Sequence, residues 1–303
     1  MAYRRLTADQ WLVGTVERPD LQPNGGPVNL DINSLDFTAT YGVTDRLNLS
    51  LTLPFSYGTQ ARDYTDSLPH KVSSLGLGDV NLTANAWVLH PAAHANGNFA
   101  FGLGVKTPSG SNHAQDRWYN TVGPSRYFVD QSVQRGDGGW GIILQTQAFQ
   151  KLFPNGYGYL SGFYLVSPRA ESDVFFSPSR TPGPGNPYAG VRLAVPDVYN
   201  ARLGLVYALP DQGLSLSLGG RLDGIPVRDL VGGGENAFRR PAVVAYVEPG
   251  VAWARGNSTF TLSLPVRVFY DFRASLIDQQ RIGRPGGGDL AKYLLFASYT
   301  IRP

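Results

Sequence analysis

The segment Tyr41-Gly-Val-Thr-Asp-Arg-Leu-Asn-Leu-Ser-Leu-Thr-Leu-Pro-Phe55 decides the fold class. From Leu47 to Phe55 every second residue is leucine or phenylalanine, and three of the four residues between them are Asn, Ser or Thr. A period of two places all of these apolar side chains on one face of a β-strand. Residues 34–41 alternate in the same way, and Thr44-Asp45-Arg46 is suited to a tight turn between the two runs. The segment therefore predicts a β-hairpin of two long strands, each with one apolar and one polar face.

The composition narrows the possible classes of protein. The 303 residues include 36 glycines and 22 prolines, and charged residues make up only 16%, well below the roughly 25% that is usual in soluble domains. The most apolar window is too short and too interrupted for a transmembrane helix. The chain has no cysteine, which excludes disulfides, thiolate metal sites and cysteine nucleophiles. A net charge of +3, dispersed along the chain, does not indicate nucleic-acid binding.

The two-residue alternation recurs along the whole chain and indicates about twelve strands in an all-β, single-domain fold over residues 1–303. The predicted strands cover residues 10–16, 34–41, 47–55, 79–89, 99–106, 140–148, 157–166, 199–207, 214–221, 243–253, 260–268 and 293–301. Many of these runs approach the roughly nine to eleven residues that a tilted strand needs to cross a bilayer, whereas strands of soluble proteins are usually shorter.

The connections between these strands alternate in length. Short turns are expected at residues 44–46, 90–98, 153–156, 210–213 and 255–258, and long loops at residues 17–30, 57–74, 107–137, 167–197, 224–240 and 271–289. A soluble sandwich or propeller gives no reason for one end to carry every long loop. Bacterial outer-membrane barrels have this asymmetry, with short periplasmic turns and long extracellular loops. The sequence therefore predicts a transmembrane, antiparallel up-and-down β-barrel in the bacterial outer membrane, with both termini in the periplasm.

Charged residues on the polar face of the strands are the candidate pore-lining residues. By strand parity they are Asp36, Asp79, Lys106, Arg202, Arg221, Glu248, Arg267 and Lys292. Two interpretations stay open: the charges pair with one another and brace a water-filled interior, or the basic residues form a constriction that favours anionic solutes. Because consecutive strands are neighbours in such a barrel, we expect the three arginines on one wall, with Asp36 and Asp79 on the opposite one.

The histidines give little indication of metal binding or catalysis. His90 and His94 have the spacing of two zinc ligands on a helix, but they lie in a predicted turn without a cysteine or an acidic third ligand nearby. All four histidines fall in predicted loops or turns, whereas a serine hydrolase in the barrel wall would need a histidine beside a serine on a strand. We therefore expect no enzyme activity, no metal site and no cofactor.

Several strand-and-turn segments resemble a known family. They are Tyr41-Gly-Val-Thr-Asp-Arg-Leu47, Leu49-Ser-Leu-Thr-Leu-Pro-Phe55, Gly76-Leu-Gly-Asp-Val-Asn-Leu82 and Gly102-Leu-Gly-Val-Lys-Thr-Pro-Ser-Gly110. In these segments the chain resembles the family of outer-membrane transporters named for the meta-pathway of phenol degradation. The resemblance extends over most of the chain, and it implies a barrel that transports aromatic or otherwise hydrophobic compounds.

These patterns together predict a monomeric outer-membrane channel, surrounded by outer-membrane lipid, through which small-molecule solutes pass passively. The resemblance implies aromatic solutes, and the basic residues of the predicted lumen favour anionic ones such as carboxylates or phenolates. The alternative function is that of a structural or interaction barrel, whose extracellular loops bind a partner.

Overall fold

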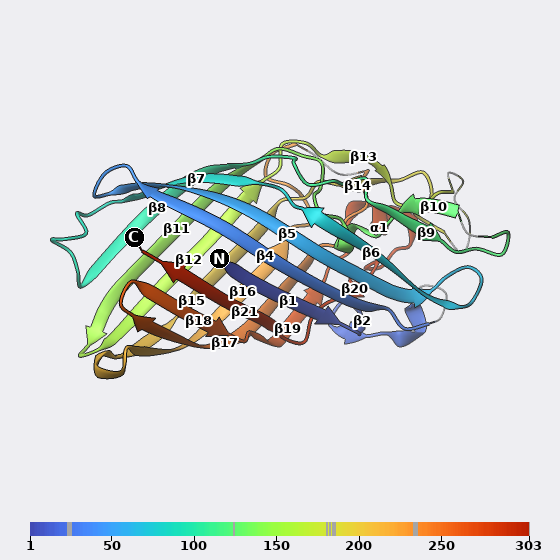
Figure 1. Cartoon of the computed structure of the whole chain (residues 1–303). Coiled ribbons are helices and arrows are strands. Elements are labelled where there is room, and N and C mark those ends of the chain that lie inside the picture. The colour runs from blue at the N-terminus through green and yellow to red at the C-terminus, as the bar shows by residue number, and fades with distance from the viewer. Residues whose placement is uncertain are drawn as a thin grey trace.

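Long antiparallel strands form a closed wall, with the long connections gathered at one end and the short turns at the other (Figure 1). The computed structural model describes residues 1–22, 26–123, 125–179, 181, 183, 186–232 and 236–302. We call the two ends of the barrel the loop end and the turn end. The C-terminus lies at the turn end.

The wall is one large antiparallel sheet. Its strands are β1 (Ala2–Ala8), β4 (Asn29–Gly42), β5 (Leu47–Asp63), β6 (Pro69–Leu77), β7 (Asn81–Trp87), β8 (Gly97–Lys106), β11 (Gly141–Phe153), β12 (Gly156–Val166), β15 (Val198–Leu209), β16 (Leu214–Ile225), β17 (Ala242–Arg255), β18 (Ser258–Ser263), β19 (Val266–Phe272) and β21 (Leu294–Ile301).

The wall closes into a barrel with twelve strand positions, as the sequence predicts. β16 pairs with both β15 and β17, and β1 pairs with both β4 and β21, so the sheet has no first or last strand. β6 and β7 pair with successive parts of β5 and together form one interrupted strand. β18 and β19 do the same along β17, and their interruption falls at Leu264-Pro265, where proline has no N–H to donate to the ladder.

The two faces of the wall follow the alternation in the sequence. On the outside, Phe37 and Phe55 meet edge to face with ring centroids 6.0 Å apart. On the inside, Thr38 and Thr52 are partners in the strand register, and their hydroxyls lie 2.9 Å apart. Large apolar side chains remain exposed around the wall, including Leu49, Leu51, Leu53, Phe101, Leu103, Leu144, Leu203, Leu205, Leu216, Leu218, Phe260, Leu262 and Leu264. An apolar belt of this extent is what a bilayer covers in an outer-membrane barrel.

The first strand of the wall is not the predicted one. The alternation predicts it at residues 10–16, whereas the wall uses β1, and the short strands β2 (Trp11–Val13) and β3 (Val16–Glu17) of this segment lie at the loop end. β1 shows no apolar alternation because Arg4 and Arg5 put a guanidinium on each face, where they pair with Asp36 and Asp31, each at 3.0 Å. The apolar signal at Trp11 and Leu12 comes from burial under the loops instead.

The predicted loop at residues 57–74 is also largely strand. β5 continues to Asp63 and β6 begins at Pro69, so the hairpin projects past the apolar belt. Polar residues such as Thr59 and Gln60 occupy this extension and are buried. The sequence pattern failed here because the projecting hairpin is covered by other loops rather than by lipid.

The remaining elements belong mainly to the loop end and form a cap. They are β2 (Trp11–Val13), β3 (Val16–Glu17), β9 (Gln115–Trp118), β10 (Ser125–Phe128), β13 (Glu171–Phe175), β14 (Arg192–Ala194), β20 (Gly288–Asp289), α1 (Leu276–Arg281) and the 3-10 turns η1 (Pro19–Leu21) and η3 (Gln131–Val133), while the 3-10 turn η4 (Pro210–Gln212) lies in a short connection. The cap has its own hydrophobic core, in which Tyr188, Phe238 and Ile277 pack together.

No helix among the described residues is long and apolar enough to cross a membrane.

The two faces of the wall should respond differently to a charge. Leu51→Arg or Leu264→Arg places a guanidinium in hydrocarbon and should lower the free energy of unfolding by about 2–4 kcal/mol. Thr52→Arg, one residue from Leu51, points into the lumen and should cost much less. Urea unfolding in lipid vesicles measures the three values, and equal losses at Leu51 and Thr52 would show that the faces are assigned wrongly.

Candidate functional site

The connection between β8 and β11 folds into the loop end of the barrel. Its turn η3 packs on the inner face of β5, where a side chain at Gly58 would come within 3.1 Å of Val133 Cγ1. Glycine at this position lets the turn approach the wall closely. The carboxylate of Asp130 accepts hydrogen bonds from the Ser132 N–H at 3.0 Å and the Ser132 hydroxyl at 2.8 Å, which fixes the start of the turn.

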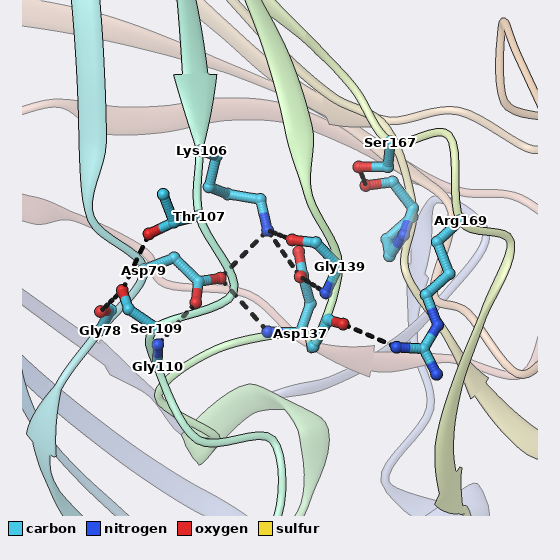
Figure 2. Close-up of polar contacts among 12 residues, drawn as sticks. Gly78, Asp79, Lys106, Thr107, Ser109, Gly110, Asp137, Gly139, Ser167 and Arg169 are labelled. Carbon is cyan, nitrogen blue, oxygen red and sulfur yellow. Dashed lines mark hydrogen bonds and ion pairs between the residues drawn. The ribbon is translucent and has the colours of Figure 1, made fainter.

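Lys106, the last residue of β8, fastens this connection to the wall. Its ammonium donates to Asp79 Oδ2 at 3.1 Å, to Asp137 Oδ1 at 2.6 Å and to the Gly139 carbonyl at 2.8 Å (Figure 2). The side chain is only 8% exposed. Because an ammonium has three donors, all of its hydrogen-bonding capacity is used within the protein.

Asp79 holds the two ends of the connection at one point. It lies in the interruption between β6 and β7, and its carboxylate also accepts the Gly110 N–H at 2.9 Å. The Ser109 hydroxyl donates to the Gly78 carbonyl at 3.0 Å (Figure 2). It also accepts the Val80 N–H at 2.8 Å. At the interruption, backbone groups of Gly78 and Val80 therefore bond to the loop instead of to a neighbouring strand. We call Asp79, Lys106 and Asp137 the loop tether.

A second ion pair anchors η3 from the other side. Arg240 forms two hydrogen bonds to the Asp130 carboxylate, at 2.9 and 3.1 Å. Burial alone would raise the pKa of Asp130, but attraction to Arg240 outweighs it and holds this pKa well below the usual range. Nearby Asp289 lacks such a partner: burial raises its pKa to about 7, and among the described residues its Oδ1 has no hydrogen bond. Asp289 is therefore only partly ionised near neutral pH.

Between η3 and the opposite wall lies a cavity of about 530 Å³, within the roughly 300–1,000 Å³ range of small-molecule sites. Asp289 and the η3 residues Gln131 and Ser132 line it from the loop side. Most of the wall side is apolar, and its lining includes Leu6, Ile32, Val244, Phe272, Leu294 and Phe296. The cavity is thus an apolar chamber inside the barrel with a few polar groups around it.

The three predicted arginines form a row across neighbouring strands. Arg202 on β15 lies opposite Arg221 on β16 in the strand register. Tyr246 on β17 separates Arg221 from Arg267 on β19. The sequence-predicted arginines therefore share one part of the wall, although Glu248 lies among them.

The members of this row differ in how their charges are balanced. Arg202 pairs with the buried Glu248, with Nε donating to Oε2 at 2.9 Å. Arg221 donates through Nε alone to Asp223 Oδ2, at 2.8 Å. Arg267 donates to the Leu290 carbonyl at 2.8 Å and to Gln10. Among the described residues no carboxylate lies within 4.0 Å of the Arg267 guanidinium, so its charge is not neutralised by an ion pair.

The other predicted residues lie elsewhere. Asp36 pairs with Arg4 at 3.0 Å. Lys292 lies in the segment before β21, half-exposed, and its Nζ is 3.2 Å from Asp9. Of the eight candidates, the structure joins Lys106 to Asp79 and Arg202 to Glu248 directly.

Sequence reasoning missed several residues of this region. Asp223 carried a usable signal, because it lies two residues from Arg221 and thus on the same strand face. Arg4 was missed because β1 was placed wrongly. Asp137, Arg240 and Asp289 lie outside regular alternation, and only the folded loops bring them to the barrel.

The histidines lie apart from the cavity lining. His90 approaches Asp45 at 3.4 Å at the turn end, and the His94 ring lies 3.3 Å from the His90 carbonyl. His70 on β6 pairs with Asp66 in the β5–β6 connection, and His113 pairs with Asp173 in the cap. Within the described part of the chain, no group of three or more metal-ligating side chains is present.

Comparison with known proteins places the fold. The structure is similar to an outer membrane channel from Pseudomonas putida F1, with a TM-score of 0.64 and 17% sequence identity over 98% of this chain and 91% of that one. It also aligns with the beta domain of the Bordetella autotransporter Brka (TM-score 0.44, 12% identity, 100% of this chain and 98% of that one). A third match is OmpT, an outer membrane protein of Vibrio cholerae, with a TM-score of 0.37 and 9% identity over 99% of this chain and 95% of that one.

No family model matches the sequence, and no curated protein matches it. The similarity to the Pseudomonas channel shows that this chain has the fold of an outer-membrane β-barrel, and the other two are too distant to add to it. None of these comparisons names the phenol-degradation family, so that part of the resemblance stays a prediction.

The loop tether gives a direct test of how the connection is held. Lys106→Met leaves the carboxylates of Asp79 and Asp137 without their cation and should cost about 3–5 kcal/mol of stability. It should also speed protease cleavage within residues 107–137. Lys151→Met is the matched control, because Lys151 is an exposed lysine at the turn end of the neighbouring strand. Equal cleavage rates in both variants would show that Lys106 does not hold the loop.

Proposed function

We propose that this chain is a channel of the bacterial outer membrane, which passes small solutes passively and is not an enzyme. One observation carries the proposal: the closed wall is apolar outside and polar inside, and it encloses a cavity of about 530 Å³. A protein that is stable in water would have these faces exchanged. The structural similarity to an outer membrane channel supports the same function.

The proposed orientation follows the general arrangement of outer-membrane barrels. The turn end faces the periplasm with both termini on that side, and the cap faces the outside. The whole chain, residues 1–303, acts as one domain and one monomer, because the closed wall leaves no long strand edge for pairing with a second copy. Lipid contacts the outer belt, and no nucleic acid, metal or cofactor is needed.

The lumen has two zones with different chemistry. At the loop end, η3 and the loop tether narrow it to the apolar chamber. Toward the turn end, small hydroxyls line the inner wall, as in the contacts of Thr40 with Ser50 at 2.9 Å and of Thr261 with Ser298. A solute would thus be selected at the chamber and then leave through a hydrated passage. Small, partly apolar solutes fit this path, and aromatic or anionic compounds are the proposed class.

The closed cap favours a second candidate function. Its loops are held by ion pairs and have a hydrophobic core of their own, as a rigid binding surface would. In that case the barrel would only anchor extracellular loops that recognise a partner. Conductance separates the two functions, because a plugged anchor has no continuous water path.

Planar-bilayer recordings test the channel and its selectivity together. The parent should give discrete conductance steps and a mild preference for anions in a salt gradient, weaker at high salt because screening shortens the field of the arginine row. The variant Arg202→Ser/Arg221→Ser/Arg267→Ser should conduct but lose most of this preference. The matched control Arg46→Ser/Arg255→Ser/Arg302→Ser removes three arginines at the turn end and should keep it.

The outcomes are distinct. Absence of any conductance from folded parent protein would contradict the channel and favour the anchoring function. If the triple variant is as anion-selective as the parent, the arginines only brace the lumen.

A further inference from the structure

One guanidinium of the chamber has hydrogen-bond donors that the protein does not use. Arg221 lines the cavity and is held through Nε alone, by Asp223 at 2.8 Å. Its guanidinium carbon lies 4.8 Å from the ring centroid of Phe296, so a cation–π contact adds to the Asp223 hydrogen bond in holding the group in place. Nη1 and Nη2 make no hydrogen bond to any residue that the structure describes. Arg221 therefore presents an oriented, unused pair of donors.

The other cations near the chamber are already engaged. Arg4 and Arg5 are paired with Asp36 and Asp31. Arg240 makes two hydrogen bonds to Asp130. Arg267 uses its donors on Leu290 and Gln10 and does not line the cavity, although its charge adds to the positive potential of the row. Arg221 is thus the cation of the chamber that has free N–H groups for a hydrogen-bond acceptor on a ligand.

Apolar side chains form much of the wall around these donors. Phe296, Leu294 and Val244 line the same cavity on the wall strands. A ligand that fits must therefore combine an oxygen acceptor at one end with an apolar body. Its size is limited by the cavity volume of about 530 Å³ to that of an ordinary small metabolite.

We propose that the chamber is a binding site for small monocarboxylates with an apolar body, and that Arg221 is the residue that recognises the carboxylate. This inference rests on the proposed channel function and names its solute class. The planar fork of a guanidinium matches the two oxygens of a carboxylate, which gives a bidentate, charge-assisted contact. The apolar body replaces water against Phe296 and its neighbours.

The charges around Arg221 favour one negative charge on the ligand rather than two. Asp223 already takes part of the positive charge of Arg221. Asp289 lines the same chamber and adds a negative charge whenever it is ionised. A dianion such as phosphate would be repelled by these carboxylates more strongly than a monoanion. Only the free edge of the Arg221 guanidinium would oppose that repulsion.

Calorimetric titration of the purified, folded chain in a non-ionic detergent tests the assignment, with 4-phenylbutyrate as the probe and 4-phenylbutyramide as its uncharged analogue. The parent should bind the carboxylate more tightly than the amide. Arg221→Gln should weaken carboxylate binding by roughly ten-fold or more, because a charge-assisted contact is lost, and should leave amide binding unchanged. Arg221→Lys, which keeps the charge but loses the fork, should give an intermediate affinity.

Arg267→Gln removes one charge of the same row without removing a cavity contact, so it measures the contribution of the overall field alone. Its guanidinium stacks on Tyr270 at the same 4.8 Å as Arg221 on Phe296, but it lies outside the cavity lining. This variant should bind the carboxylate within about two-fold of the parent, whereas an equal loss in both variants would mean that only the overall field matters and that no fork contact exists. Equal affinity of the parent and Arg221→Gln would also overturn the assignment.

Folding and conduction are measured separately from binding. The shift in electrophoretic mobility between unheated and boiled samples shows whether Arg221→Gln is folded, and Arg221→Lys carries the test if it is not. A parent that conducts without Arg221-dependent binding refutes this inference alone. A parent that binds the carboxylate but does not conduct refutes the channel alone.

Discussion

Closure of the hydrogen-bonded wall is the constraint on which the rest of the structure depends. In hydrocarbon each backbone N–H or C=O without a hydrogen-bond partner destabilises the folded protein by several kcal/mol. A strand with one apolar face is therefore stable in a bilayer only if both of its edges are paired. The pairing of the first wall strand, β1, with the last, β21, completes the ring, and this closure turns the period-two alternation into a lipid-facing exterior and a hydrated interior.

The interior that closure creates is then divided by the loops. A ring of twelve strands is wide enough to admit the η3 connection, and the loop tether holds that connection at a break in the wall. At the break, the Gly78 carbonyl and the Val80 N–H bind the Ser109 hydroxyl, and the Asp79 carboxylate accepts the Gly110 N–H. An interruption that looks like a defect of the strand is thus the attachment point of the loop. The apolar chamber exists because the loop is held there.

The sequence predicts the wall well and the cap poorly, for a physical reason. Along a membrane strand one face meets lipid and the other meets water at every position. The wall strands, such as Leu47 to Phe55, therefore show a regular alternation of apolar and polar residues. The cap is held by contacts between distant residues, such as Arg240 with Asp130, and these leave no periodic trace. β1 was misplaced because Arg4 and Arg5 interrupt the apolar pattern. Strand parity places Arg202 and Glu248 on the polar face, but their ion pair reaches across β16 and, like the free donors of Arg221, appears only once the neighbours are in place.

Thiol labelling along β5 tests the central claim, that the polar face meets water and the apolar face meets lipid, most directly. The chain contains no cysteine, so single cysteines introduced at each position from Asn48 to Leu53 report without background. In lipid vesicles, a charged methanethiosulfonate reagent should modify the variants at Asn48, Ser50 and Thr52 quickly and those at Leu49, Leu51 and Leu53 slowly. Labelling rates that do not alternate, or that alternate in the opposite phase, would contradict the account.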